Sequence, residues 1–147
     1  FEFPDSDVIC GYTTSFRMGQ ILECHVSLPE RDTDPRSYII QTVIPEIRSV
    51  MKDRGYSKVE NNKERGGMFL LGVKDALFKV QGDFSAIRFR DPSYAAIGEG
   101  AREAYGAMAA LEEDGMIPRD KVRAAILASS KFNTGVELPI SICQTSV

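Results

Sequence analysis

The spacing of apolar residues changes twice along the chain, from helical to alternating and back to helical. Residues 3–11 predict a short buried strand that ends at a glycine. A helix is expected to follow, because apolar residues then recur at intervals of three and four. They are Met18, Ile21, Leu22 and Val26. Pro29 ends this first helix.

A second helix is expected to begin at Thr33-Asp34-Pro35, where a capping residue precedes a proline at the first helical position. Its apolar stripe is Ile40, Val43, Ile44, Ile47, Val50 and Met51. Pro45 should bend this helix, because proline removes a backbone hydrogen bond at a cost of ~3 kcal/mol. Gly55 closes the helix, and the polar residues 57–66 predict a mobile loop.

Three strands of an antiparallel meander are predicted next, because the helical period ends at residue 67 and one continuously apolar run and two alternating runs follow. The strands are 68–73, 76–80 and 85–90, with turns at Lys74-Asp75 and Gly82-Asp83. In the third strand Arg88 and Arg90 alternate with Ile87 and Phe89. This alternation predicts that the two arginines face water.

Helical spacing returns after a short predicted strand at residues 94–97. The first of two helices has Ala101, Ala104, Tyr105, Met108 and Leu111 on one face, and the second begins at Pro118 and buries Val122, Ala125, Ile126 and Ser129. Residues 139–143 predict a closing strand. Paired helices between blocks of antiparallel strands indicate an α+β fold rather than a doubly wound parallel sheet.

Composition restricts the classes of protein to consider. A chain of 147 residues with 43% hydrophobic content suits one domain, 1–147. The net charge of −3, with both signs interspersed, offers no basic field for nucleic acid. The apolar runs are too short for a membrane span, and no leader pattern opens the chain. Cys10, Cys24 and Cys143 suit reduced thiols, which predicts a cytoplasmic protein.

Metal, nucleotide and Cys-His chemistry find little support in the sequence. His25 has no partner at metal-ligand spacing, and Cys24 beside it points about a hundred degrees away on a helix. Gly98 and Gly100 could open a dinucleotide fingerprint, but Glu103 occupies the position of the third glycine. We therefore expect no cofactor and no metal.

Residues 69–142 resemble the second half of a proteasome β-type subunit, or of the bacterial ATP-dependent peptidase related to it. In that family a small-residue strand ends in Gly-Ser-Gly, then come a helix with an alanine and glycine face, another helix and an apolar closing strand. The sequence VICGYTTSFRMGQIL, residues 8–22, is similar to the family's strand that ends in a small residue and glycine before a helix. The resemblance extends from Asp7 to Ile142 and is closest in character to bacterial and bacteriophage members.

This resemblance implies the N-terminal-nucleophile (Ntn) hydrolase fold, a four-layer αββα sandwich of antiparallel sheets. It implies that an N-terminal threonine attacks a peptide carbonyl while its own α-amino group acts as general base. A lysine and an aspartate support the threonine, and a backbone N–H stabilises the oxyanion. The implied partners are polypeptide substrates, further copies in a homo-oligomeric ring and an ATP-dependent unfoldase.

Three residues at the start of the chain match substrate-facing positions of the family. Gly11 matches the glycine whose N–H stabilises the oxyanion; the alternative is a glycine in a strand-to-helix turn. Ile9 matches the floor of the pocket for the side chain before the cleaved bond; the alternative is a core residue. Thr13 would lie along the wall of that pocket.

Departures from the family occur at three later positions. Glu99 matches a serine near the nucleophile's amine, and a carboxylate there would raise the pKa of that amine. Alternatively, Glu99 opens a helix whose dipole favours it by ~0.3–1 kcal/mol. Asn133 matches a supporting aspartate, and Val136 matches a further serine.

The family's first two strands, ~30–40 residues that carry the threonine, aspartate and lysine, have no counterpart in residues 1–147. The sequence begins at Phe1 rather than methionine, and neither Thr13 nor Thr14 is N-terminal. Three interpretations stay open. The residues could belong to an active threonine-type peptidase whose nucleophile lies upstream, to a non-catalytic ring or scaffold subunit, or to an Ntn amidohydrolase of another specificity.

Overall fold

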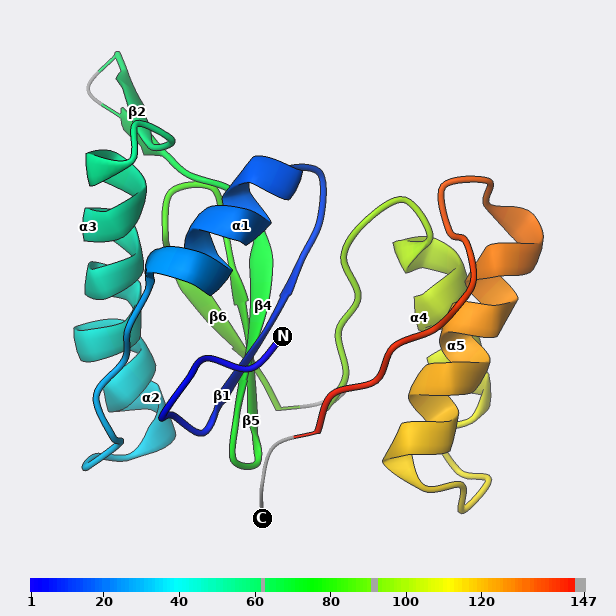
Figure 1. Cartoon of the computed structure of the whole chain (residues 1–147). Helices are drawn as coiled ribbons and strands as arrows, with labels where there is room; N and C mark the ends of the chain where they lie inside the picture. The colour runs from blue at the N-terminus through cyan, green and yellow to red at the C-terminus, as the bar shows by residue number, and fades with distance from the viewer. Residues whose placement is uncertain (62, 91–92, 145–147) are drawn as a thin grey trace. The chain divides into compact units, whose positions relative to one another are not determined.

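A computed structural model describes residues 1–61, 63–90 and 93–144 (Figure 1). The chain divides into two compact units. Unit 1 comprises the described residues of Phe1–Ser93 with those from Cys143 onwards, and unit 2 comprises Tyr94–Ile142. Our expectation of one domain over 1–147 stays a prediction, because two compact units can still fold cooperatively.

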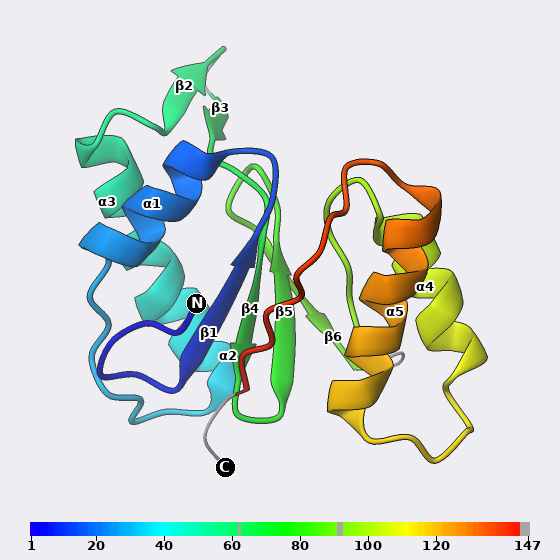
Figure 2. The same ribbon diagram turned by 45° about the vertical axis from the view of Figure 1, so that its right-hand side comes forward.

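Unit 1 contains a four-stranded antiparallel sheet of strand order β1-β4-β5-β6 (Figure 2). The strands are β1 (Val8–Tyr12), β4 (Phe69–Val73), β5 (Ala76–Val80) and β6 (Ala86–Phe89). The predicted meander is thus confirmed, and the predicted first strand is confirmed in its second half. The initial segment lies along the outer edge of β1, the edge that does not face β4. There the Cys10 N–H donates to the Phe1 carbonyl oxygen at 2.8 Å.

Helices cover one face of this sheet (Figure 1). They are α1 (Phe16–His25), α2 (Pro35–Tyr38), the π-helical η1 (Ile39–Val43) and α3 (Ile44–Asp53). The first predicted apolar stripe is fully buried, and so is most of the second; Ile40 is 39% exposed and Val50 is half-buried. Together with the alternate residues Phe69, Leu71 and Phe78 these side chains form the core of unit 1.

Pro45 is accommodated by a widened helical turn. Proline clashes with the carbonyl four residues earlier, here that of Gln41, and has no N–H to donate. The turn before it is π-helical, and the Ile44 N–H donates to the carbonyl oxygen of Ile39, five residues back. The predicted disturbance is therefore present as a π-helical segment, one of the known causes of helix distortion.

The predicted mobile loop at residues 57–66 is wrong. This segment forms a two-stranded hairpin of β2 (Lys58–Glu60) and β3 (Lys63–Arg65). Asn61 has a φ of 49°, and asparagine tolerates this left-handed conformation in tight hairpin turns. Tertiary contacts hold the hairpin, because Arg48 of α3 and Ser57 both donate hydrogen bonds to the Glu64 carboxylate.

The predicted water-facing position of Arg88 is also wrong. Arg88 lies directly opposite Phe78 of β5, so that both side chains share the helix-covered face of the sheet. Its guanidinium carbon is 6.0 Å from the centre of the Phe78 ring, whereas Ile87 on the other face is 47% exposed. The half-buried Arg88 thus makes a cation–π contact at the edge of the core, while its buried Nε has no hydrogen-bond partner among the described residues.

Unit 2 is a pair of packed helices, α4 (Ala101–Ala110) and α5 (Pro118–Phe132). Ala125 and Ser129 are buried as predicted, but Val122 is 39% exposed. The strands predicted at residues 94–97 and 139–143 are wrong, since both segments lack strand pairing in the structure. An apolar sequence forms a strand only when another strand supplies hydrogen bonds, and periodicity does not reveal whether that neighbour is present.

The α+β class with antiparallel sheets is confirmed by this arrangement. Helices and antiparallel strands occur in separate blocks along the chain, rather than in alternating βαβ units. The described residues contain one four-stranded sheet and the short β2–β3 hairpin.

Cys10 provides a direct test of the sheet position. Burial raises the pKa of its thiol to about 12, whereas Cys24 and Cys143 are exposed. We expect a maleimide or disulfide reagent at pH 8 to modify Cys24 and Cys143 rapidly and Cys10 only after denaturation, because the thiolate is the reactive form. Mass spectrometry of peptides from native and denatured protein measures this difference. Equal labelling of Cys10 in the native protein would contradict the placement of β1.

Candidate functional site

Ile9 lies on the sheet face opposite the helices. Strand side chains alternate, and its neighbours Val8 and Cys10 point into the core while Ile9 is only half-buried. Gly72 of β4 leaves room for it, because a Cβ atom at Gly72 would lie 2.8 Å from Ile9 Cγ1. Ile9 is therefore not part of the core of unit 1, and its predicted role as a pocket floor stays a prediction.

Gly11 lies on the same face, within β1 and opposite Leu70. The alternative of a strand-to-helix turn glycine is wrong, because β1 continues to Tyr12 and α1 begins only at Phe16. A Cβ atom here would make an ordinary contact, 3.9 Å from Leu70 Cβ. Packing within unit 1 therefore gives no reason for a glycine at this position.

Backbone direction distinguishes Gly11 from its neighbours. Cys10 donates to and accepts from Phe1 at the outer edge of β1. Because N–H groups alternate in direction along a strand, the N–H of Gly11 points toward β4 and that of Tyr12 points to the outer edge. The outward donor next to Gly11 is thus the Tyr12 N–H, which the sequence pattern alone did not indicate.

Thr13 follows β1 in a tight connection to α1. Its carbonyl oxygen accepts from the Ser15 N–H at 2.9 Å, and Ser15 Oγ caps the helix by accepting from the Met18 N–H at 3.1 Å. Thr14 between them has a φ of 76°, which is strained for a β-branched residue. The sequence signal for this cap was a serine directly before the helical pattern. No sequence signal indicated the strained backbone at Thr14.

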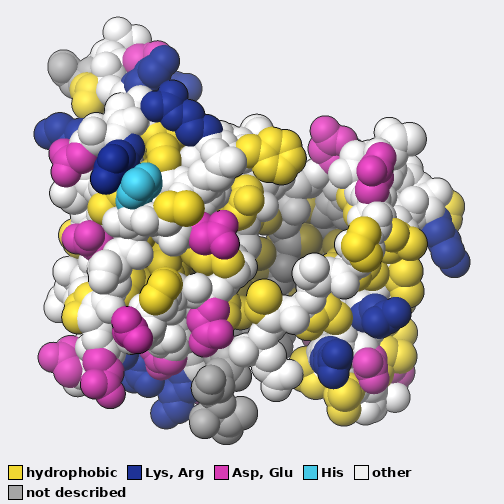
Figure 3. Space-filling view, in the orientation of Figure 1, with side chains coloured by type: hydrophobic (Ala, Val, Ile, Leu, Met, Phe, Trp, Pro, Cys, Tyr) yellow, Lys and Arg dark blue, Asp and Glu magenta, His cyan; other side chains and the backbone are white. Residues whose placement is uncertain are grey.

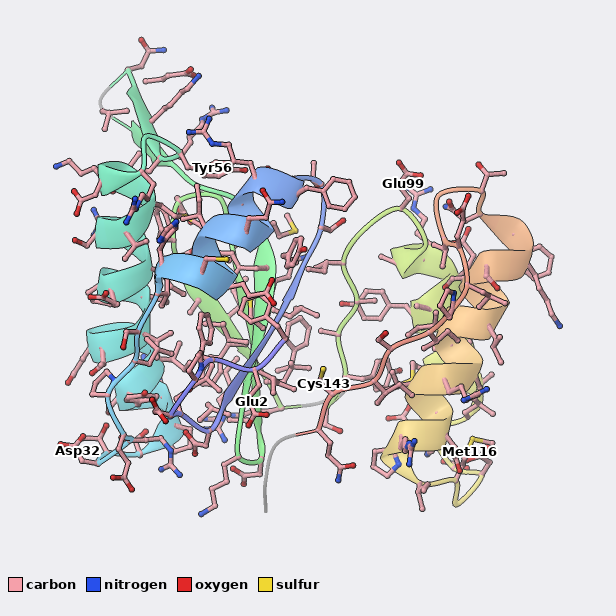
Figure 4. All side chains as sticks on the ribbon, in the orientation of Figure 1. Glu2, Asp32, Tyr56, Glu99, Met116 and Cys143 are labelled. Carbon is pink, nitrogen blue, oxygen red and sulfur yellow. The ribbon has the colours of Figure 1, made fainter. Side chains whose placement is uncertain are left out.

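In unit 2 the structure brings together the three positions that depart from the family pattern. Glu99, labelled in Figure 4, precedes α4. Asn133 and Val136 follow α5. A Cβ atom added to Gly135 would lie 2.0 Å from Glu99 Oε2, which places the carboxylate directly over that glycine. Asn133 Oδ1 accepts from the Gly135 N–H at 2.9 Å. Glu99 and Asn133 therefore both lie beside Gly135 within this unit, and their predicted roles stay predictions.

Ser129 fixes the loop that carries Glu99. Its hydroxyl is buried and lies 2.9 Å from the carbonyl oxygens of both Gly100 and Ala125, and it can donate its single proton to either. A Cβ atom at Gly100 would lie 2.8 Å from Ser129 Cβ and 2.6 Å from Val136 Cγ2. The sequence predicted burial of Ser129 but not this contact, because the partner is 29 residues away.

Local structural roles also account for Glu99 and Asn133. Gly100 is the N-cap of α4, so the exposed Glu99 stands just before the positive end of the helix dipole. Asn133 is the C-cap of α5, and its N–H donates to the Ser129 carbonyl oxygen at 2.9 Å. These contacts fit the helix-start alternative for Glu99, and they leave its carboxylate accessible.

Other chemistries receive no support from the described part of the chain. It holds no group of three or more His, Cys, Asp or Glu side chains arranged for a metal ion. His25 and Cys24 are both exposed on α1. No helix among residues 1–61, 63–90 and 93–144 is both long and apolar enough to cross a membrane.

Comparison with known proteins gives a match in structure alone. No family model matches the sequence, and the search of curated proteins finds no significant relative. Among solved structures, "Thiobacillus denitrificans BPH" is similar over 90% of this chain and 72% of its own, with a TM-score of 0.71 and 20% identity. This chain has a proteasome-like fold.

A second solved structure, "Thiobacillus denitrificans BPH in complex with Epoxomicin", is also similar to this chain. It matches over 90% of this chain and 70% of its own, with a TM-score of 0.63 and 18% identity. Within the proteasome-like fold, the predicted residues form one group in each unit. Ile9, Gly11 and Thr13 belong to unit 1, and Glu99 and Asn133 belong to unit 2.

Proposed function

We propose that this chain belongs to a threonine-type peptidase subunit that cleaves polypeptides inside the cell. The observation that supports this most directly is the similarity, over 90% of the chain, to a protein solved in complex with epoxomicin, a proteasome inhibitor. Ile9 and Gly11 lie on the sheet face opposite the helices, where Ile9 is only half-buried, and this face suits an apolar side chain of a substrate.

The proposed reaction begins when the hydroxyl oxygen of an N-terminal threonine adds to the peptide carbonyl carbon and the threonine amine takes the hydroxyl proton. The carbon–nitrogen bond then breaks, the leaving amine receives that proton, and water hydrolyses the acyl-threonine ester. Thr13 and Thr14 are internal, so the proposal assigns the nucleophile to a threonine upstream of Phe1.

Residues of unit 1 would bind the substrate in this reaction. Ile9 would form an apolar floor for the side chain before the cleaved bond, and Thr13 would form part of the pocket wall. Backbone N–H groups stabilise a developing oxyanion when they point at it. The N–H of Gly11 points toward β4, so in this proposal the outward N–H of the adjacent Tyr12 takes the donor role that the resemblance assigned to Gly11.

The Glu99–Asn133 group of unit 2 would act on the nucleophile's amine. A carboxylate near an amine favours its protonated form and so raises the amine pKa. Glu99→Gln is therefore expected to move the acid limb of the pH–rate profile toward lower pH, by up to about one unit. Peptide hydrolysis between pH 5 and 9 measures this shift, and an unchanged profile would contradict the assigned role.

Further copies in a homo-oligomeric ring and an ATP-dependent unfoldase are the partners that we propose, with cytoplasmic localisation. A closed chamber would admit unfolded polypeptides and keep folded proteins away from the active sites. The proposal includes no nucleic acid, membrane, metal or cofactor.

Epoxomicin tests the peptidase proposal. N-terminal sequencing of the purified full-length protein is expected to show a threonine, and epoxomicin is expected to abolish cleavage of fluorogenic peptides. Intact mass should then increase by one inhibitor per chain. A native N-terminus at Phe1, or the absence of both turnover and adduct, would refute the proposal.

A non-catalytic ring or scaffold subunit is the second candidate. It is favoured by the accessible carboxylate of Glu99 over Gly135 and by the lack of a hydroxyl at Val136. This candidate predicts an assembled protein that neither hydrolyses peptides nor reacts with epoxomicin.

A further inference from the structure

The β2–β3 hairpin carries two like charges directly opposite each other. The register pairs Lys58 with Arg65, and both side chains are exposed. Because the neighbouring Glu64 turns toward Arg48 of α3, Lys58 and Arg65 lie on the other face of the hairpin. Like charges in this position destabilise a strand pair. An anionic partner between them would relieve the repulsion.

This pair is part of a larger basic surface, which we call the basic end of unit 1. Its exposed members are Arg17, Lys52, Arg54, Lys58 and Arg65. The Arg17 guanidinium donates to the Arg54 carbonyl oxygen at 3.1 Å, which joins α1 to the end of α3. Exposed acidic residues also occur on these segments, namely Glu23 on α1, Asp53 at the end of α3 and Glu60 on β2. Basic side chains gather around β2 in Figure 3.

The other end of the long helix is acidic, and we call it the acidic end. Its exposed members are Glu2, Asp5, Glu30, Asp32 and Asp34. Several of them line an open hollow of about 620 Å³, whose Arg31 is bound to Asp7 at 2.9 Å. Arg36 is the exposed basic residue nearby in the sequence. Figure 4 labels Asp32 here and Tyr56 beside the basic end.

The helix dipole does not account for this separation of charge. Acidic residues at a helix N-terminus and basic residues at its C-terminus are favourable, but the effect fades within one turn. The helix from Pro35 to Asp53 separates the two ends by roughly 25–30 Å. Lys58 and Arg65 on the hairpin, and Glu2 and Asp5 near β1, lie outside that helix.

We propose that the basic end of one copy binds the acidic end of a second copy, head to tail. Carboxylates of the acidic end would accept charge-assisted hydrogen bonds from Lys58 and Arg65. A pair joined in this way still has one free basic end and one free acidic end, so the contact repeats until the copies close into a ring. This proposal supplies contact surfaces for the proposed ring, but it does not depend on peptidase activity.

Sedimentation velocity of the full-length protein tests the contact without any substrate. Self-association is expected at about 50 mM NaCl and should weaken roughly tenfold or more at about 500 mM, because salt screens exposed charges. Lys58→Glu with Arg65→Glu should abolish association, and so should Glu30→Lys with Asp32→Lys. A mixture of the two double variants should restore it, because each then meets a surface of opposite charge. Arg123→Glu with Lys131→Glu, on the exposed surface of α5, is the matched control.

Three outcomes would overturn the proposal. They are a wild-type protein that stays monomeric at low salt, an association unaffected by Lys58→Glu with Arg65→Glu, and a mixture of folded variants that fails to associate. A monomer that instead binds polyglutamate through Lys58 would assign the basic end to another acidic partner. Circular dichroism of each variant verifies its folding. The two proposals can fail separately. If the protein hydrolyses peptides but does not self-associate, only the contact proposal fails. If it self-associates through these surfaces but does not hydrolyse peptides, only the peptidase proposal fails.

Discussion

Phe78→Ala is expected to reduce the free energy of unfolding of unit 1 by about 3–5 kcal/mol. Phe78 is 1% exposed in the middle of the sheet, where it packs within the core and lies beneath the Arg88 guanidinium. Truncation removes apolar contacts, leaves a cavity and also deprives Arg88 of its aromatic partner. The rigid sheet on one side and helices on the other limit how far the cavity can collapse.

Chemical denaturation followed by circular dichroism measures this loss. Phe16→Ala is the matched control, because Phe16 is 84% exposed on α1 and the same truncation should change stability by no more than about 0.5 kcal/mol. If both variants lose the same stability, Phe78 is not the central core residue described here.

Gly100→Ala is expected to destabilise unit 2 by about 1–3 kcal/mol. The new methyl group would overlap Val136 Cγ2 and Ser129 Cβ, both of which belong to stiff or buried side chains. The Ser129 hydroxyl would move from the Gly100 carbonyl oxygen, and the Glu99 loop would loosen with it. Hydrogen exchange across residues 94–142 should therefore accelerate.

Gly135→Ala is the matched control in the facing loop. Its methyl group would meet the Glu99 carboxylate, which is the end of a flexible, exposed side chain that can turn away. We expect a loss below about 1 kcal/mol and little change in exchange within α4. Equal effects of the two substitutions would show that Ser129 and Val136 do not hold the Glu99 loop.

Sequence patterns predicted the helices better than the isolated strands. Helical periodicity and the Asp34-Pro35 start depend on residues close together in the chain, and the structure confirms both. Hydrogen bonds from Ser37, first from its side chain and then from its N–H, lower the pKa of the Asp34 carboxyl, and the Arg36 N–H adds to this effect. The strands predicted at 94–97 and 139–143 failed because a strand requires a partner that local sequence does not specify.

The sequence indicated which residues to consider for the site, but not how their groups are oriented or what they contact. The family resemblance located Glu99 and Asn133, and the structure brings their loops together in unit 2. It did not indicate that the N–H of Gly11 points toward β4, because that direction depends on which edge of β1 is paired. Nor did it indicate the Ser129 contact, which joins two helices distant in sequence.

By itself, the sequence determined the α+β class, the helix starts and most of the buried helical stripes. These features follow from side-chain period and backbone chemistry over a few residues. Tertiary structure alone decided that Arg88 covers the Phe78 ring, that residues 57–66 form a hairpin held by Arg48, and that Glu99 lies over Gly135. Each of those outcomes depends on contacts between residues far apart in the chain, whose energies a local pattern does not contain.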